Sequence, residues 1–145
     1  MGKKKSPPPA FATIGKNEHF TPMYDDQLNS PAFIALPAVA VRVYMILRQQ
    51  YKGDYTGNRV KCPYEMIIER GVSRNSISGA IRILEELGLI SCERGGLGNQ
   101  PSIYHFTEEW KNIATKEEAE AIVKRVKQDI ANEKKYKKLA EESLA

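Results

Sequence analysis

The sequence predicts a mainly α-helical protein with a small β-hairpin and a long final helix. Apolar residues recur at three- and four-residue spacing over 37–51 and 74–87, which is the period of an amphipathic helix. Two short runs of strand-forming residues flank a glycine-rich stretch at 94–101, as in a hairpin. A chain of 145 residues, of which 41% are hydrophobic and 28% charged, suffices for one globular domain with tails but not for two.

We expect residues 1–19 to form a flexible arm that is basic and rich in proline. Lys3-Lys4-Lys5 precede Pro7-Pro8-Pro9, and proline lacks the backbone donor that regular elements use. The first six residues formally fit an N-myristoylation motif. Because that pattern is short, we interpret the segment as an arm that adds non-specific affinity for nucleic acid.

The next segment predicts two helices and a short strand. Ser30 is placed as an N-cap with Pro31 at the first helical position, which indicates a helix start. A longer helix follows from about Pro37 to Tyr51, and the turn-forming cluster at 53–58 ends it. Residues 59–62 are predicted to form a short strand. The apolar stripe of the longer helix comprises Ala40, Val43, Tyr44, Leu47 and Tyr51.

A second helical pair and a hairpin complete the predicted body. Pro63 opens a brief helix that stops near Gly71, and Ser73 is a suitable N-cap for a helix from Arg74 to Leu87. Gly88 stands where a helix C-cap glycine belongs. Two strands are expected at 89–93 and 102–106. The apolar face of the helix after Ser73 comprises Ile77, Ala80, Ile81, Leu84 and Leu87.

Helix, short strand, helix, tight turn, helix, strand, glycine-rich loop and strand is the element order of a winged helix-turn-helix, which we place at residues 20–111. The run 71–90 resembles the turn, recognition helix and first wing strand of bacterial winged-helix DNA-binding domains. Residues 40–44 and 96–104 are similar to the first helix and the wing of one subset. That subset lies at the N-terminus of plasmid replication initiators and related mobile-element proteins.

The resemblance implies a non-catalytic, sequence-specific double-stranded DNA-binding protein. It would regulate transcription or act as an initiator-type replication protein of a bacterial mobile element, in the cytoplasm, on nucleoid or plasmid DNA. The recognition helix, 74–87, would enter the major groove, and the wing, 94–102, would touch the backbone. The alternative is a winged-helix protein–protein interaction module that does not bind DNA.

Arginine, asparagine and serine are suited to contacts with guanine, adenine and phosphate. The candidate contacts from the recognition helix and its N-cap are Ser73, Arg74, Asn75, Ser76, Ser78 and Arg82. Those from the wing are Arg94, Asn99, Gln100 and Ser102. Two residues depart from the family pattern: Arg70 replaces an apolar residue before the turn, and Gly79 replaces a polar residue in mid-helix. Gly79 would either allow a closer approach to DNA or mark a weaker contact.

The net charge of +4 permits a nucleic-acid partner but does not demand one. Residues 1–58 carry seven basic and four acidic side chains, residues 59–106 six and five, and residues 107–145 nine of each. Most of the positive excess therefore lies outside the predicted body. We expect the arginines at positions 74, 82 and 94 to supply the DNA-facing charge by their placement.

Enzyme, metal and membrane classes find no support in the sequence. No catalytic triad, paired-carboxylate motif or phosphate-binding loop is present, so we expect no catalysis, cofactor or small-molecule ligand. The spacing of Cys62, Cys92 and His105 matches no zinc pattern. Two cysteines fit a reducing compartment, and no apolar run approaches the length of a membrane span.

The final segment, residues 112–145, is predicted to be helical. Thr115 and Glu118 form a capping-box pattern at its start. A narrow apolar stripe follows, which comprises Ala119, Ile122, Val123, Val126 and Ile130. Two interpretations remain open: this helix pairs with a second copy in a homodimer, or it folds back on its own domain.

Overall fold

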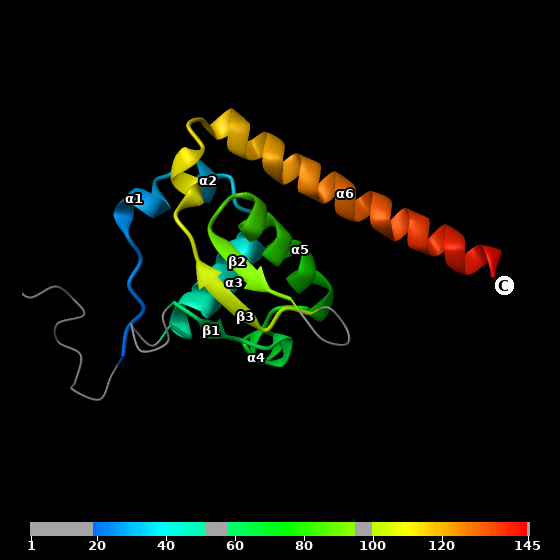
Figure 1. Cartoon of the computed structure of the whole chain (residues 1–145), viewed down its shortest axis with the longest axis horizontal. Helices are drawn as coiled ribbons and strands as arrows, with labels where there is room; N and C mark the ends of the chain where they lie inside the picture. Colours follow the sequence, from blue (N-terminus) through cyan, green and yellow to red (C-terminus); the bar gives the residue numbers. More distant parts are fainter. Residues whose placement is uncertain (1–18, 52–57, 95–99, 145) are drawn as a thin grey trace, which may run out of the picture.

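The computed structural model describes residues 19–51, 58–94 and 100–144 (Figure 1). Helices α1 (Asp25–Leu28), α2 (Pro31–Ile34) and α3 (Ala38–Gln49) come first. They are followed by β1 (Val60–Lys61), α4 (Tyr64–Glu69), α5 (Arg74–Glu86), β2 (Ile90–Glu93) and β3 (Ile103–Phe106). A short 3₁₀ helix (Glu109–Asn112) leads into α6 (Lys116–Ser143). The predicted fold class is confirmed: the protein is mainly helical, with a small sheet in a winged-helix-like arrangement.

The three strands form an antiparallel sheet in the order β1-β3-β2. Cys92 of β2 stands opposite Tyr104 of β3, and Val60 of β1 pairs with the same tyrosine on its other side. The side-chain amide of Asn58 donates to the carbonyl of Phe106 (2.7 Å) and accepts from its N–H (3.0 Å). These two hydrogen bonds hold Asn58, two residues before β1, against the end of β3.

The core lies between α3, α5 and the sheet. Both predicted stripes are buried in it, apart from Tyr51, which is half-buried. Tyr44 is buried among apolar side chains, yet its hydroxyl accepts a hydrogen bond from Gln27 (2.7 Å), which satisfies a polar group that would otherwise destabilise the core. α3 and α5 therefore pack through the faces that the sequence indicated.

The turn between α4 and α5 is held by an arginine from α3. Gly71 has a φ of +93°, a conformation that favours glycine. Arg42 donates to the carbonyl of Arg70 (2.6 Å), and its guanidinium covers Gly71. The Arg70 side chain in turn donates to Gln49 (3.3 Å) and to the carbonyl of Met66 (3.2 Å). A polar residue suits position 70 because it bridges α3 and α4 at the surface.

Gly88 ends α5 in the left-handed conformation, with a φ of +79°, as its predicted C-cap position requires. A Cβ at this position would lie 2.6 Å from the backbone nitrogen of Trp110. The Gly88 carbonyl also accepts hydrogen bonds from that N–H (3.2 Å) and from the Thr107 hydroxyl. The end of α5, the start of β2 and the segment after β3 therefore meet at one glycine.

α6 folds back on its own domain. Thr115 caps it by accepting from the N–H of Glu118 (3.2 Å), while the Glu118 carboxylate reaches the N–H of Ala114 (3.3 Å). Its first half packs on α5 and α2, and it buries Ala119, Val123 and Val126. The apolar stripe is thus used within the chain. A homodimer through α6 would have to use other residues and stays a prediction.

α6 contacts α5 at Gly79. A Cβ at this position would lie 3.3 Å from Cδ1 of Ile130, so the absence of a side chain lets the two helices approach. Beyond Ile130 the side chains at 131–144 are all exposed. Figure 1 shows this half of α6 extending past the other elements.

We expect Gly88→Ala to destabilise the protein by about 2 kcal/mol or more. Alanine would be strained at this φ, and its Cβ would press on the backbone at Trp110, which cannot move aside as a flexible side chain can. Urea unfolding followed by circular dichroism measures the change. A variant as stable as the native protein would contradict the described packing.

Gly79→Ala is the matched substitution with the opposite expectation. Gly79 is helical, and its nearest neighbour is the end of the half-buried Ile130 side chain, which can shift. Alanine should therefore stabilise α5 by up to about 1 kcal/mol. The same urea titration tests this, and a destabilisation above about 1 kcal/mol would show that Ile130 is held too tightly to move.

Candidate nucleic-acid interface

One strip of α5 remains exposed between the core and α6. Arg74, Asn75, Ser78 and Arg82 lie within about 100° of one another around the helix, between the core stripe and the side that faces α6. Three of them are exposed, and the Arg82 side chain is 32% exposed. We call these four residues the α5 strip. The structure thus brings together four of the predicted contact residues on one surface.

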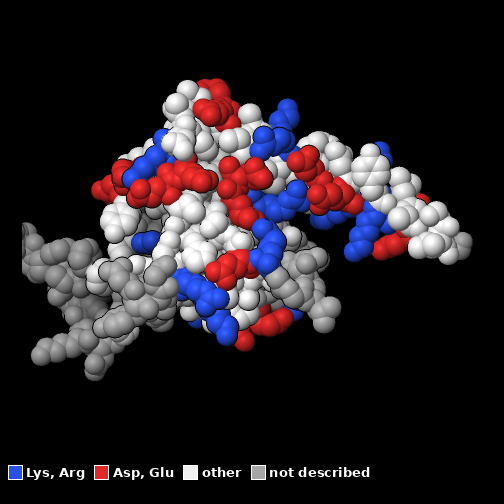
Figure 2. Space-filling view, viewed as in Figure 1, with Lys and Arg blue, Asp and Glu red and all other residues white. Residues whose placement is uncertain are grey.

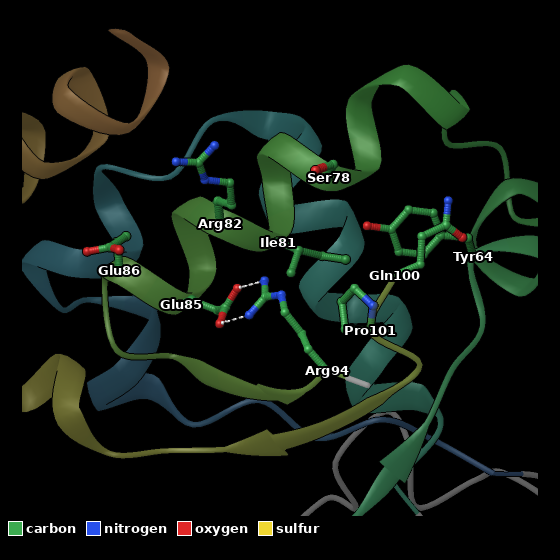
Figure 3. A pocket seen from close by; sticks show the side chains of 9 residues that line it. All are labelled: Tyr64, Ser78, Ile81, Arg82, Glu85, Glu86, Arg94, Gln100 and Pro101. Atoms are coloured by element: carbon green, nitrogen blue, oxygen red, sulfur yellow. Dashed lines mark hydrogen bonds and ion pairs between the residues drawn. The ribbon is translucent and has the colours of Figure 1, made fainter. Parts of the chain in front are cut away.

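Two depressions flank the α5 strip. The wing-side hollow, of about 500 Å³, lies between α5 and the hairpin (Figure 3). The α6-side groove, of about 510 Å³, lies between α5 and α6. Ser78 and Arg82 line both depressions and so form the ridge between them. A ligand in either depression would therefore contact Ser78 and Arg82.

The wing is attached to α5 by a two-pronged ion pair. Arg94, at the end of β2, donates to both carboxylate oxygens of Glu85, one of them at 2.9 Å (Figure 3). These hydrogen bonds raise the pKa of the Arg94 guanidinium. In the same view Arg82 points away from this pair. Arg94 was predicted to contact DNA backbone, and its charge is already matched by an acidic partner.

The other two predicted arginines are also paired. Arg74 bonds Glu65 of α4 (2.6 Å), and Arg82 bonds Glu133 of α6 (2.8 Å). Exposed pairs of this kind contribute only about 0–1 kcal/mol, so phosphate can replace the carboxylate. While they persist, however, they remove the positive potential expected of these arginines. Figure 2 shows basic and acidic side chains interspersed over the visible face.

Of the two depressions, the α6-side groove is the one with a net positive charge. The wing-side hollow is lined by two arginines and two glutamates and is neutral overall. The α6-side groove is lined by four basic side chains and one carboxylate, a net charge of +3. Its lysines, which the sequence interpretation missed, are Lys127, Lys134 and Lys137. Lys134 and Lys137 follow Ile130 at helical spacing, a signal that was present in the sequence.

The other residues predicted to contact DNA differ in their exposure and location. Ser73 occupies the N-cap position of α5 and is exposed, but its side chain makes no capping hydrogen bond. Ser76 is half-buried and faces the α6-side groove. Gln100 lines the wing-side hollow. The backbone carbonyl of Ser102 accepts a hydrogen bond from the backbone N–H of Cys62 (2.7 Å). Asn99 and residues 1–18 of the arm lie outside the described residues.

Gly79 faces α6, beneath Ile130, instead of pointing outward between the strip residues. Helix packing therefore explains why a glycine stands at this position. A role in bringing DNA closer to α5, one of the two interpretations of this position, is not what its neighbours indicate.

The cysteines and His105 do not form a joint site. Cys92 pairs with Tyr104 and His105 with Ser91, so the strand register places Cys92 and His105 on opposite faces of the sheet. Burial raises the pKa of Cys62 to about 11 and that of Cys92 to about 12. Both are therefore thiols at neutral pH, a form that is less nucleophilic than the thiolate. Within 19–51, 58–94 and 100–144, no three potential metal ligands cluster.

No helix within the described ranges combines the length and the apolar character that crossing a membrane requires. A scan against protein-family models, a search of curated proteins and a search of solved structures each found no match for this chain. The resemblance to winged-helix initiator domains stays a prediction from the sequence. Function is therefore inferred from the α5 strip and the two depressions beside it.

Proposed function

We propose that this protein binds double-stranded DNA, without catalysis, by placing α5 in the major groove. The α5 strip is the observation that carries the proposal. It presents arginine and asparagine, the side chains that pair in two-pronged fashion with guanine and adenine, on one exposed face. Among the described residues, the strip lies between the wing-side hollow and the α6-side groove.

The dimensions and the polarity of α5 agree with this proposal. A major groove about 12 Å wide admits one helix. Arg74 and Asn75 are in the first turn of α5, where the helix dipole and the N–H groups favour phosphate. Glu85 and Glu86 stand at the far end of the helix, which leaves the groove in this orientation.

The biological setting is part of the same proposal. Regulation of transcription or initiation of replication for a bacterial mobile element, in the cytoplasm, is supported by the family resemblance alone. The geometry of the strip is compatible with either role, because both begin with recognition of a duplex.

A protein–protein interaction module is the second candidate, and one observation favours it. Each arginine predicted to face DNA already has a carboxylate partner, and the wing-side hollow is neutral. A neutral surface rich in hydrogen-bonding groups suits a protein partner. The two candidates differ in salt dependence, since only DNA binding releases condensed counterions.

Arg82→Ala should weaken binding to a specific duplex by about 1–3 kcal/mol. The site is obtained by enriching bound sequences from a random duplex library, and affinity is measured by fluorescence anisotropy at two salt concentrations. The reason is that the variant removes a base or phosphate interaction from the ridge of the strip. If the native protein binds no duplex even at low salt, the interaction module is the better proposal.

Glu133→Gln is the matched variant, and it should act in the opposite direction. It breaks the same ion pair but leaves the Arg82 guanidinium available and removes a carboxylate near DNA. Affinity should rise, by up to about fivefold, because an exposed pair is worth at most about 1 kcal/mol. If both variants weaken binding equally, the pair supports the structure and Arg82 does not read DNA.

A further inference from the structure

The lysines on one face of α6 lie beside the surface that we propose for DNA. From this placement we infer that α6 is a second DNA-binding element. Its Lys127, Lys134 and Lys137 would bind the phosphate backbone that borders the major groove on the side away from the wing. The inference rests on the proposed function and assigns a role to a helix outside the winged-helix body.

The first argument is position. Lys127, Lys134 and Lys137 line the same groove as Asn75 and Arg82. The apolar stripe of α6 ends at the half-buried Ile130, and Lys134 and Lys137 continue that side of the helix. The face of α6 that packs on α5 therefore changes from apolar to basic alongside the α5 strip.

The second argument is space. Helices have a diameter of about 10–12 Å, and packed pairs have axes about 8–10 Å apart. The contact between Ile130 and Gly79 shows that α6 lies directly against α5. A major groove about 12 Å wide cannot hold both helices. When α5 enters the groove, α6 must lie over the adjoining phosphate ridge.

The third argument is charge. The α6-side groove has a net charge of +3, and its single carboxylate, Glu133, is already bonded to Arg82. Lysine carries a compact charge on a flexible stem, which suits contact with a phosphate whose position varies along the backbone. The wing-side hollow offers no comparable excess, so α6 supplies the positive potential that the paired arginines do not.

The test compares two triple variants of the full chain. The first replaces the lysines at positions 127, 134 and 137 with glutamine. The matched control replaces Lys124, Lys135 and Lys138 with glutamine; these lie on the same helix but do not line the α6-side groove. Both remove three exposed charges, so circular dichroism should show equal helix content. Binding to a fluorescent random-sequence duplex is followed between about 50 and 200 mM salt.

The groove variant should reduce the slope of log affinity against log salt by about 0.9 for each phosphate that is no longer neutralised, or roughly 3 in all. The control should change the slope by less than about 1, because charges that do not face the backbone are screened. A groove variant whose slope changes no more than that of the control would overturn the role of Lys127, Lys134 and Lys137 while leaving DNA binding by α5 intact. If the native protein binds no duplex at all, the proposed function and this inference fall together.

Discussion

Helix α5 is packed from two sides, and the rest of the described structure is arranged around that constraint. Its apolar stripe faces α3 and the sheet, while Gly79 and Ile83 face α6. A helix that buries side chains in two directions retains only a narrow exposed strip. On either side of that strip, described residues of the hairpin and of α6 line the wing-side hollow and the α6-side groove.

The distribution of charge around the α5 strip depends on this packing. A carboxylate from each of α4, α5 and α6 forms an ion pair with one of the predicted arginines, so the two arginines of the strip and Arg94 are neutralised within the chain. The lysines of α6 outnumber the single carboxylate of the groove that they line with Arg82. The result is an asymmetric surface, neutral toward the wing and positive toward α6. A single total of +4 conceals this difference.

Local patterns in the sequence were sufficient for most of the fold. Periodicity located α3 and α5, turn chemistry located Gly88, and the caps at Ser30 and Thr115 hold hydrogen bonds as expected. α1 was not predicted, because four residues are too few to show a helical period. The correct predictions, of α3, α5, Gly88 and the two caps, share one cause: each signal lies within a few residues of the structure that it specifies.

The candidate site was predicted less completely, for the complementary reason. Which residues of α5 are exposed can be read from its period, but their partners cannot. Arg82 and Glu133 are far apart in the sequence, and so are Arg42 and the turn that it holds. Only the folded chain shows that Gly79 serves helix packing and that the basic face of α6 lies beside the α5 strip.

The projecting half of α6 also sets a length scale. From Ile130 to Ser143 the helix continues for about 20 Å at its usual rise of about 1.5 Å per residue. Duplex DNA advances about 3.4 Å per base pair, so this rod is as long as roughly six base pairs. If α5 binds a duplex as proposed and α6 lies along it, the protein would protect a longer tract from nuclease digestion than its small body alone could cover, and asymmetrically about the bases that α5 contacts.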